Sequence, residues 1–249
     1  MKINAPKELQ KDLWLEAFGN SDGALEIFEN TAFSPQRSRC ITIDNKTVSV
    51  LYWFDCTCDG QKLAYIYAVA TAEAYRGRGL CTALMNDTHR HLKENGYDGA
   101  ILVPSSESLF GLYGKIGYRV CSTIDEICCT AAKESIELQR IDTEEYARLR
   151  RSFLPPGGVI QEGENLRYLE AGDSFYKGEN FLLSAYRTGN TLYGSELLGN
   201  ADKASAIVKA LGCTEGKFRI PGDGRPFAMY YNLSNKTTAM PSYFGLAFD

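Results

Sequence analysis

Two arginines alternate with two glycines in residues 75–81, which read Tyr-Arg-Gly-Arg-Gly-Leu-Cys. The run before them, residues 64–71, is apolar and rich in aromatic and branched side chains, which predicts a buried strand. Residues 80–95 repeat apolar side chains at helical spacing and stop before Gly96, which predicts a helix with a left-handed C-terminal cap. The first N–H groups of a helix lack partners and carry partial positive charge, so a glycine-rich helix start can hold phosphate oxygens. The stretch therefore predicts a pyrophosphate site.

Two well-known phosphate loops do not fit this stretch. It lacks the Lys-Ser/Thr pair of a P-loop, and Thr82 stands where a dinucleotide-binding motif has its third glycine. An ordinary strand-to-helix turn with solvated arginines is the alternative that the motif alone leaves open.

A second segment with unusual glycines follows. Residues 100–103 are apolar and end at Pro104, which predicts a short strand, and the Ser-Ser-Glu of residues 105–107 predicts a helix N-terminus. The helix expected over residues 108–116 contains Gly111 and Gly114, and a glycine in a helix costs roughly 1 kcal/mol relative to alanine. Either the backbone there lies close to a bound ligand, or the helix packs tightly on a neighbouring element.

Together the two segments resemble the GNAT superfamily of N-acyltransferases. Arg76, Gly79 and Cys81 fall on its acyl-CoA loop, Arg/Gln-x-x-Gly-x-Gly/Ala, with cysteine replacing the last small residue. Residues 112–118, Leu-Tyr-Gly-Lys-Ile-Gly-Tyr, are similar to the family signature Leu-Tyr-Glu-Lys-x-Gly-Phe. The resemblance is strongest over residues 45–123.

The resemblance implies transfer of an acetyl group from acetyl-CoA to a primary amine, with a small molecule favoured over a protein amino group as the acceptor. It implies that Tyr113, with a phenol pKa of about 10, protonates the leaving thiolate. It also implies a set of residues that contact acyl-CoA, with Ser106 standing where the family often has asparagine. The set comprises Val69, Ala70, Thr71, Arg76, Gly77, Arg78, Gly79, Leu80, Cys81 and Ser106.

The sequence does not identify a general base. Several GNAT relatives carry a glutamate on the central strand where this chain has Tyr65. Tyr65 and Tyr67 share one face of the predicted strand, where they line the acceptor pocket, relay a proton through water, or pack. Asp55 and Glu73 are the nearest carboxylates in sequence, and Glu73 is expected to be solvated. Some tandem relatives use a terminal carboxylate, which nominates Asp249.

The remaining patterns predict an α/β fold in two domains, with a mixed central sheet and flanking helices of the GNAT type. The chain has 249 residues, more than one minimal acyltransferase domain needs. We predict a catalytic GNAT domain over residues 1–134 and a second, smaller GNAT-like α/β domain over residues 135–249. The first domain should begin with helices over residues 9–18 and 24–28 and strands over residues 39–43 and 47–54.

The second half repeats the order of the first. Asp142 and Glu145 predict a capped helix start, and Gly189-Asn190 predicts a hairpin between two strands. A helix from Asn200 to Leu211, strands over residues 217–221 and 227–233, and a final strand over residues 243–248 follow. The half is either a degenerate copy of the acyltransferase fold or an unrelated small α+β domain. It lacks the glycine-arginine loop and a counterpart of Tyr113, so we expect it to extend the sheet or wall the acceptor pocket.

Composition and net charge limit the partners and the cellular compartment that we expect for this chain. The net charge is −4 and no basic stripe is present, which argues against nucleic acid as a partner. No apolar run is long enough to span a bilayer and no signal peptide is evident, so we expect no membrane association and a cytoplasmic protein. The eight cysteines do not have metal-site spacing. We expect reduced, mostly buried thiols and no metal.

Two functions remain open at this stage. The first is an active N-acetyltransferase. The alternative is a catalytically silent acyl-CoA-binding sensor or scaffold, which the missing glutamate and Cys81 permit. The sequence leaves the acceptor, the acyl chain preference and the oligomeric state open.

Overall fold

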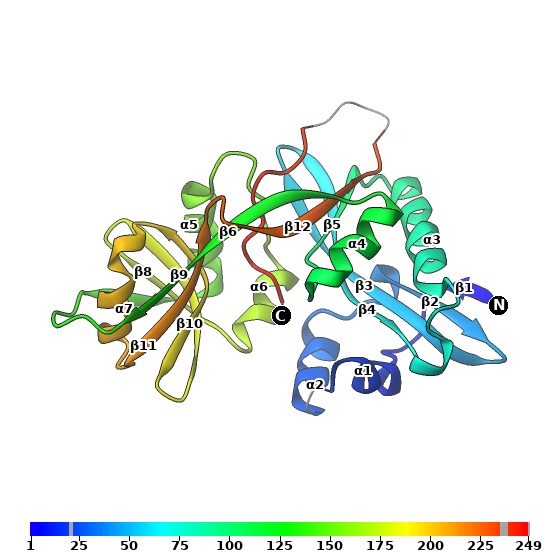
Figure 1. Ribbon diagram of the computed structural model, residues 1–249, viewed down its shortest axis with the longest axis horizontal. Coiled ribbons are helices and arrows are strands. Elements are labelled where there is room, and N and C mark those ends of the chain that lie inside the picture. Colours follow the sequence, from blue (N-terminus) through cyan, green and yellow to red (C-terminus); the bar gives the residue numbers. More distant parts are fainter. Residues whose placement is uncertain (20–21, 235–238, 249) are drawn as a thin grey trace. The chain divides into compact units, whose positions relative to one another are not determined.

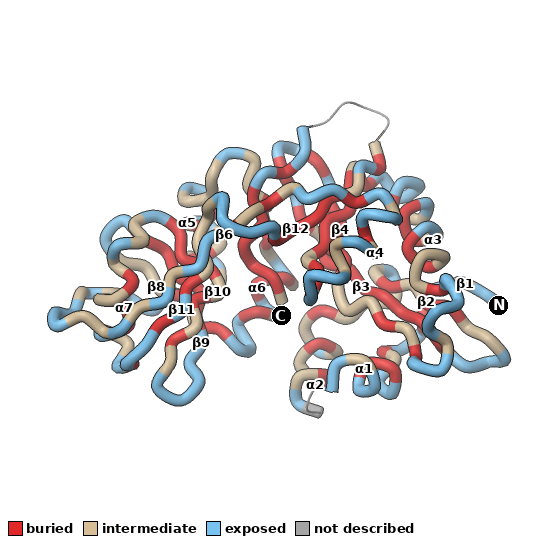
Figure 2. The backbone as a smooth tube through the Cα atoms, in the orientation of Figure 1, coloured by how far each residue is buried: buried red, intermediate tan, exposed pale blue. Residues whose placement is uncertain are grey.

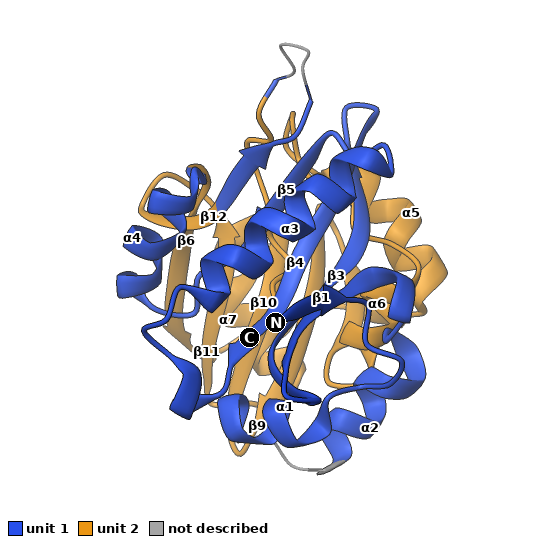
Figure 3. Cartoon of the chain, turned by 90° about the vertical axis from the view of Figure 1, so that its right-hand side faces the viewer, with its two compact units in different colours: residues 1–119, 229–239 blue, residues 120–228, 240–249 orange. Residues whose placement is uncertain are grey.

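The computed structural model describes residues 1–19, 22–234 and 239–248. The chain folds into two compact units, which Figure 3 colours separately: residues 1–119 and 229–239 form unit 1, and residues 120–228 and 240–249 form unit 2. The sequence predicted a boundary after residue 134, whereas the chain leaves unit 1 after Arg119 and returns to it at Met229. Asp249, nominated above as a base, lies outside the described residues.

Unit 1 is a sheet with helices on both faces (Figure 1). Its elements are β1 (Lys2–Asn4), α1 (Lys11–Phe18), α2 (Asp22–Thr31), the 3-10 helix η1 (Pro35–Arg37), β2 (Ser38–Ile43), β3 (Lys46–Cys58), β4 (Gln61–Thr71), the 3-10 helix η2 (Glu73–Tyr75), α3 (Leu80–Glu94), β5 (Gly99–Leu102), α4 (Glu107–Ile116) and the end of β12 (Arg225–Asn232). The strand order is β1-β2-β3-β4-β5-β12. Only β4 and β5 run parallel to each other, and the other neighbours are antiparallel.

Apolar side chains cover both faces of this sheet, and Figure 2 shows the buried residues running along β3 and β4. On one face, α3 buries Leu84, Met85 and Leu92 in a cluster with residues of β3, β4 and β5. On the other, Trp14 of α1 and Phe28 of α2 pack against aromatic rings of β3 and β4. The alternation of side chains along β4 therefore separates an α3 face from an aromatic face.

Unit 2 is also a sheet with flanking helices. Its elements are β6 (Arg119–Thr130) from residue 120 onward, β7 (Leu138–Ile141), α5 (Thr143–Phe153), α6 (Glu164–Glu170), β8 (Ser174–Gly178), β9 (Phe181–Thr188), β10 (Thr191–Gly199), the 3-10 helix η3 (Ala201–Lys203), α7 (Ala204–Ala210), β11 (Glu215–Pro221) and the start of β12. The strand order is β6-β11-β10-β9-β8-β7. Only β10 and β11 are parallel.

The two units share one topology. In each, five consecutive strands of one half of the sequence form the sheet in the same order and with the same directions. The sixth strand comes from the other half: unit 1 takes Met229–Asn232 of β12, antiparallel to β5, and unit 2 takes β6, antiparallel to β11. That the second half is a degenerate acyltransferase copy stays a prediction.

Many local predictions are confirmed. The helix that the sequence ends at Gly19 does so, with Gly19 in the left-handed region at φ 59°. The backbone N–H of Glu145 donates to Asp142 at 2.8 Å, as the predicted cap requires. The hairpin around Gly189-Asn190 joins β9 and β10.

Two strand predictions need correction. Residues 243–248 do not form a strand: Tyr243 makes one isolated bridge with Gly158, and the next backbone N–H donates to a side chain, that of Ser122, at 3.0 Å. The strand predicted over residues 227–233 exists, but its second part belongs to unit 1 because it pairs with β5. The sequence also gave no signal for β1, α6 or β8, which are short.

The eight cysteines are all free. Cys40, Cys56, Cys58 and Cys213 are buried, Cys128 is exposed, and the other three are intermediate. Within the described part of the chain, no helix is long and apolar enough to cross a membrane. In the same residues, no three His, Cys, Asp or Glu side chains come together as metal ligands.

Candidate active site

The glycine-arginine loop of unit 1 presents a row of backbone donors. Gly77 and Gly79 both have φ 74°, a left-handed conformation that glycine adopts without strain, and Gly79 is the N-cap of α3. The backbone N–H groups of residues 77–82 have no acceptor among the residues that the structure describes. Free N–H groups at a helix N-terminus are donors of the kind that bind anions in proteins.

The two loop arginines lie on the surface and bond to the loop itself. Arg76 Nε donates to the carbonyl of Thr71 at 3.1 Å, and Arg78 Nη2 donates to that of Ala74 at 2.9 Å. Arg78 also lies over the ring of Tyr75, 5.0 Å from its centroid. A guanidinium has five N–H donors, so both arginines keep donors for an anion at the loop.

A fork opens between β4 and β5 beside this loop. The parallel pairing runs from Leu63↔Gly99 to Tyr65↔Ile101 and stops there, while β4 continues along β3 to Thr71. An extra residue on β4 produces a bulge, and Ala68 adopts φ 49° within it. Beyond the fork, the backbone edge of β4 that faces β5 pairs with no strand in the described part of the chain.

The predicted residues Val69, Ala70 and Thr71 lie on this unpaired edge. Ser49 of β3 fixes its end: the Ser49 hydroxyl donates to the carbonyl of Ala70 at 2.9 Å and lies 2.8 Å from Thr71 Oγ1. Val69 packs on the unit 1 core. The edge is therefore held in place from the side opposite the fork.

Tyr113 lies on α4 with its ring buried and its hydroxyl unused. The residue is 7% exposed, and its hydroxyl makes no hydrogen bond to any described residue. Burial, and secondarily the nearby Cys81, raise the pKa of Tyr113 above its usual value of about 10, so the expectation of an ordinary pKa was wrong. Tyr113 is thus a protonated phenol throughout the physiological pH range.

Cys81 is the departure from the family loop pattern. It is partly buried at the start of α3, and burial raises the pKa of its thiol. The side chain packs on the unit 1 core and leaves the donor row open. The Cys81 side chain therefore does not occupy the free N–H groups of the loop.

Helix α4 begins where the sequence predicted. Ser106 is its N-cap, makes no side-chain cap bond, and has its hydroxyl 3.0 Å from that of Ser108. Gly111 and Gly114 are exposed, and a Cβ added at either would meet nothing within 4 Å. Tight packing on a neighbour, one of the two explanations for these glycines, is therefore wrong.

The acceptor candidates Tyr65 and Tyr67 lie on the aromatic face of β4. Tyr65 stacks on Phe54 with ring centroids 6.0 Å apart, and Tyr67 packs edge-on against Trp14 at 5.8 Å. Tyr65 is buried and Tyr67 is half-buried. Packing thus accounts for Tyr65, while Tyr67 retains an accessible surface.

Neither carboxylate weighed as a base is placed beside these tyrosines. Asp55 lies on the α3 face of the sheet, where it accepts a hydrogen bond from Tyr97 and pairs with Arg37 at 3.6 Å. Glu73 lies exposed in η2 at the loop entrance.

Two features of the site escaped the sequence analysis. The donor row includes Thr82, which the rule that the first helical N–H groups lack partners could have predicted. Glu16 of α1 accepts a hydrogen bond from the backbone N–H of Glu73 at 2.5 Å and so ties α1 to the loop entrance. No local signal could reveal a contact between residues so distant in sequence.

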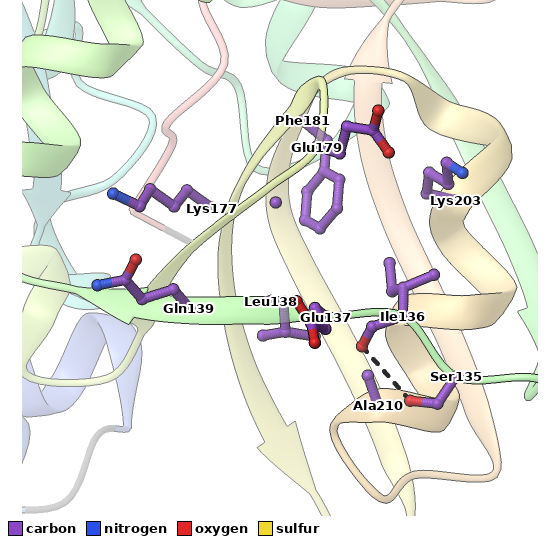
Figure 4. A pocket seen from close by; sticks show the side chains of 11 residues that line it. Ser135, Ile136, Glu137, Leu138, Gln139, Lys177, Glu179, Phe181, Lys203 and Ala210 are labelled. Carbon is purple, nitrogen blue, oxygen red and sulfur yellow. Dashed lines mark hydrogen bonds between the residues drawn. The ribbon is translucent and has the colours of Figure 1, made fainter.

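Unit 2 has a pocket of its own (Figure 4). Residues 135–139, β8 and α7 line it, with Phe181 inside and the side chains of Lys203 and Glu179 at its rim. Lys177 is bonded to Glu145 at 2.6 Å. The pocket contains none of the predicted site residues.

Comparison with protein families identifies the first half. Residues 7–121 match the family model of the acetyltransferase (GNAT) domain. This segment is a GNAT acetyltransferase domain. It contains the glycine-arginine loop, the β4/β5 fork and the whole of α4, including Tyr113. No curated protein matches the sequence significantly.

Solved structures extend the likeness in fold beyond the GNAT domain. A GCN5-related N-acetyltransferase from Anabaena variabilis aligns with a TM-score of 0.71 at 15% identity, over 94% of this chain and 73% of its own. One from Kribbella flavida gives 0.69 at 17% identity, over 93% and 72%. A tandem GNAT protein from the clavulanic acid biosynthesis pathway gives 0.56 at 11% identity, over 94% and 99%. At these identities the likeness concerns the fold alone.

Proposed function

We propose that the protein transfers an acetyl group from acetyl-CoA to the primary amine of a small molecule. The observation that carries the proposal is the row of free N–H groups at residues 77–82, next to an open strand fork in a GNAT domain. Gly79, the N-cap of α3, has no side chain that could cap these N–H groups.

The residues present fit acyl-CoA. The free N–H groups and the spare donors of Arg76 and Arg78 would hold the pyrophosphate, since both dipole and charge favour an anion there. The unpaired edge at residues 69–71 would hydrogen-bond the amide groups of the pantetheine arm as a neighbouring strand does. Ser106 at the start of α4 offers a further hydroxyl. The bare surface at Gly111 and Gly114 would let the helix backbone approach the ligand.

The proposed reaction is a direct transfer of the acetyl group to the amine. A neutral amine attacks the thioester carbonyl, a C–N bond forms, the C–S bond breaks, and the nitrogen loses its proton to water. N–H groups of the β4 edge would polarise the carbonyl oxygen. Tyr113 would give its proton to the departing sulfur and would regain one from water. Burial of the leaving sulfur would raise the pKa of its thiol, as burial raises that of the Tyr113 phenol, and this favours proton transfer from Tyr113.

Release of free coenzyme A from acetyl-CoA, measured across a panel of small primary amines, tests this function. We expect turnover with at least one amine, and a loss of about 10²- to 10⁴-fold in kcat for Tyr113→Phe with acetyl-CoA affinity unchanged. Tyr186→Phe, an exposed tyrosine of unit 2, is the matched control and should turn over normally.

Each outcome is informative. Acetyl-CoA binding without turnover on any amine would favour the silent sensor instead. Full activity of Tyr113→Phe would remove Tyr113 as the acid while leaving the transferase function in place.

A further inference from the structure

Unit 2 contains a strand fork of the same kind as unit 1. The parallel pairing of β10 and β11 runs from Thr191↔Glu215 to Gly194↔Phe218 and ends there, while β10 continues along β9 to Gly199. The register shifts between Gly194 and Glu196, so β10 carries a bulge close to its branch point, as β4 does in unit 1. Both units thus build a fork from a bulged strand and its parallel neighbour.

The C-terminal segment, residues 243–246, lies in this second fork. Arg219 of β11 donates from Nη1 to the carbonyl of Ser195 on β10 and to that of Gly245, both at 3.3 Å. The next carbonyl along, that of Leu246, accepts a hydrogen bond from Gln161 at 2.6 Å. The Arg219 side chain of β11 therefore links the backbone of the segment to the backbone of β10.

A buried ion pair completes the closure. Glu196 of β10 is 0% exposed and Arg150 of α5 is 2% exposed. The Arg150 guanidinium donates to both carboxylate oxygens of Glu196, at 2.6 and 2.8 Å. Tyr146 donates to one oxygen at 3.1 Å and Tyr243 of the C-terminal segment donates to the other at 3.0 Å. One of the four donors to this carboxylate is therefore supplied by the segment itself.

The fit at Gly245 is close. A Cβ at this position would lie 1.8 Å from the Oε1 atom of Glu196 and 2.4 Å from the hydroxyl of Tyr243. Only a residue without a side chain can pass the ion pair here, so the segment and the fork are shaped to each other.

The neighbouring helix start is closed as well. The 3-10 helix η3 runs directly into α7 with no glycine-arginine loop between them. The Asn200 side chain accepts a hydrogen bond from the backbone N–H of Asp202 at 3.0 Å and caps the turn. Unit 2 therefore lacks both the open fork and the free donor row.

We propose that residues 243–246 are a built-in occupant that locks the fork of unit 2, and that the chain consequently holds one acyl-CoA, in unit 1. The lock itself follows from contacts within unit 2. The stoichiometry of one acyl-CoA per chain rests on the proposed function, because the proposed function identifies acyl-CoA as the ligand. In unit 2 the C-terminal segment would take the position that the pantetheine arm is proposed to take in unit 1.

Hydrogen–deuterium exchange of full-length protein tests the lock at two amides, Phe244 N–H on Ser122 and Val159 N–H on the carbonyl of Tyr243. We expect Gly245→Ala to accelerate both by at least about tenfold. Gly172→Ala is the matched control in unit 2, because its added Cβ has only one neighbour, at 3.9 Å, and exchange should be unchanged. If Gly245→Ala fails to fold, Tyr243→Phe removes a single donor and should accelerate the same amides less.

Two results would overturn the lock: free-chain exchange rates at Phe244 in the unmodified protein, or unchanged exchange in both Gly245→Ala and Tyr243→Phe. Equilibrium titration with coenzyme A should give one site per chain, and two sites would overturn the stoichiometry. Failure to bind any coenzyme A would contradict the proposed function, and the exchange data would still decide the lock.

Discussion

The two strand forks begin alike and differ in what lies beyond the branch point. In unit 1, β4 and β5 separate after Tyr65↔Ile101, and the N–H groups of residues 77–82 beside them have no acceptor among the described residues. In unit 2, β10 and β11 separate after Gly194↔Phe218, and Arg219, a buried ion pair and the C-terminal segment fill the space. Each unit combines a bulged strand with a parallel neighbour.

The difference shows that this topology supplies a fork but not a binding site. A few changes at the branch point and the helix start decide whether the fork takes a ligand or becomes part of the core. In unit 1 the loop between η2 and α3 leaves backbone donors free, whereas in unit 2 the loop is missing and Asn200 caps the turn. Function resides in these local features and not in the fold that both units share.

The largest expected effect comes from breaking the polar filling of the second fork. Glu196→Gln keeps the shape of the side chain but leaves the charge of Arg150 buried without a counter-ion. Removal of one partner of a buried pair costs about 3–5 kcal/mol, so we expect the free energy of unfolding of unit 2 to fall by that amount. Denaturant unfolding followed by hydrogen exchange at Val159 measures it.

A paired replacement separates charge from packing. Arg150→Met combined with Glu196→Leu removes both charges and retains volume, and it should recover most of the stability because no charge stays unpaired. If Glu196→Gln alone left unit 2 unchanged, the ion pair would have no part in closing the fork.

We expect the free energy of unfolding of unit 1 to fall at acidic pH. His89 of α3 is 5% exposed, its Nε2 lies 2.9 Å from the Tyr118 hydroxyl, and burial lowers its pKa to about 4. The native state therefore keeps His89 neutral, while the unfolded chain takes up a proton near pH 6.5. Because the unfolded state binds more protons, stability is full above pH 6.5 and is lost as pH falls toward 4.

Between pH 7 and pH 5 this loss amounts to about 2 kcal/mol. Both tryptophans, Trp14 and Trp53, lie in unit 1, so tryptophan fluorescence during denaturant unfolding measures it. His89→Gln should flatten the pH dependence, and His91→Gln, altered on the same helix but more exposed, should retain most of it. An equal slope in His89→Gln would assign the acid sensitivity to other groups.

The local elements of unit 1 could be predicted from sequence because their signals are local. Gly96 and Gly117 end α3 and α4 in left-handed conformations, and Pro104 follows β5. The glycine-arginine loop could be predicted because its arginines and glycines are adjacent in the chain. In unit 2, the confirmed cap at Asp142 likewise depends on a residue only three positions away.

What could not be predicted depends on partners distant in sequence. The pattern of β12 identifies a strand but not its pairing with β5, more than a hundred residues earlier. The apolar C-terminal segment suggested a strand, yet its backbone groups bond to side chains such as Ser122, Gln161 and Arg219. The raised pKa of Tyr113 reflects burial, which no motif encodes.

The smallest expected effect tests why α4 keeps its glycines. Gly114 has helical geometry and an added Cβ would meet nothing, so Gly114→Ala should raise the stability of unit 1 by about 1 kcal/mol through helix propensity. If the bare surface admits acyl-CoA, the same change should raise the KM for acetyl-CoA with little effect on kcat. Gly172→Ala in unit 2 should leave KM unchanged. If Gly114→Ala were more stable but had an unaltered KM, the glycines of α4 would have no part in ligand binding. The free N–H groups at residues 77–82 would then be the feature that distinguishes the two forks.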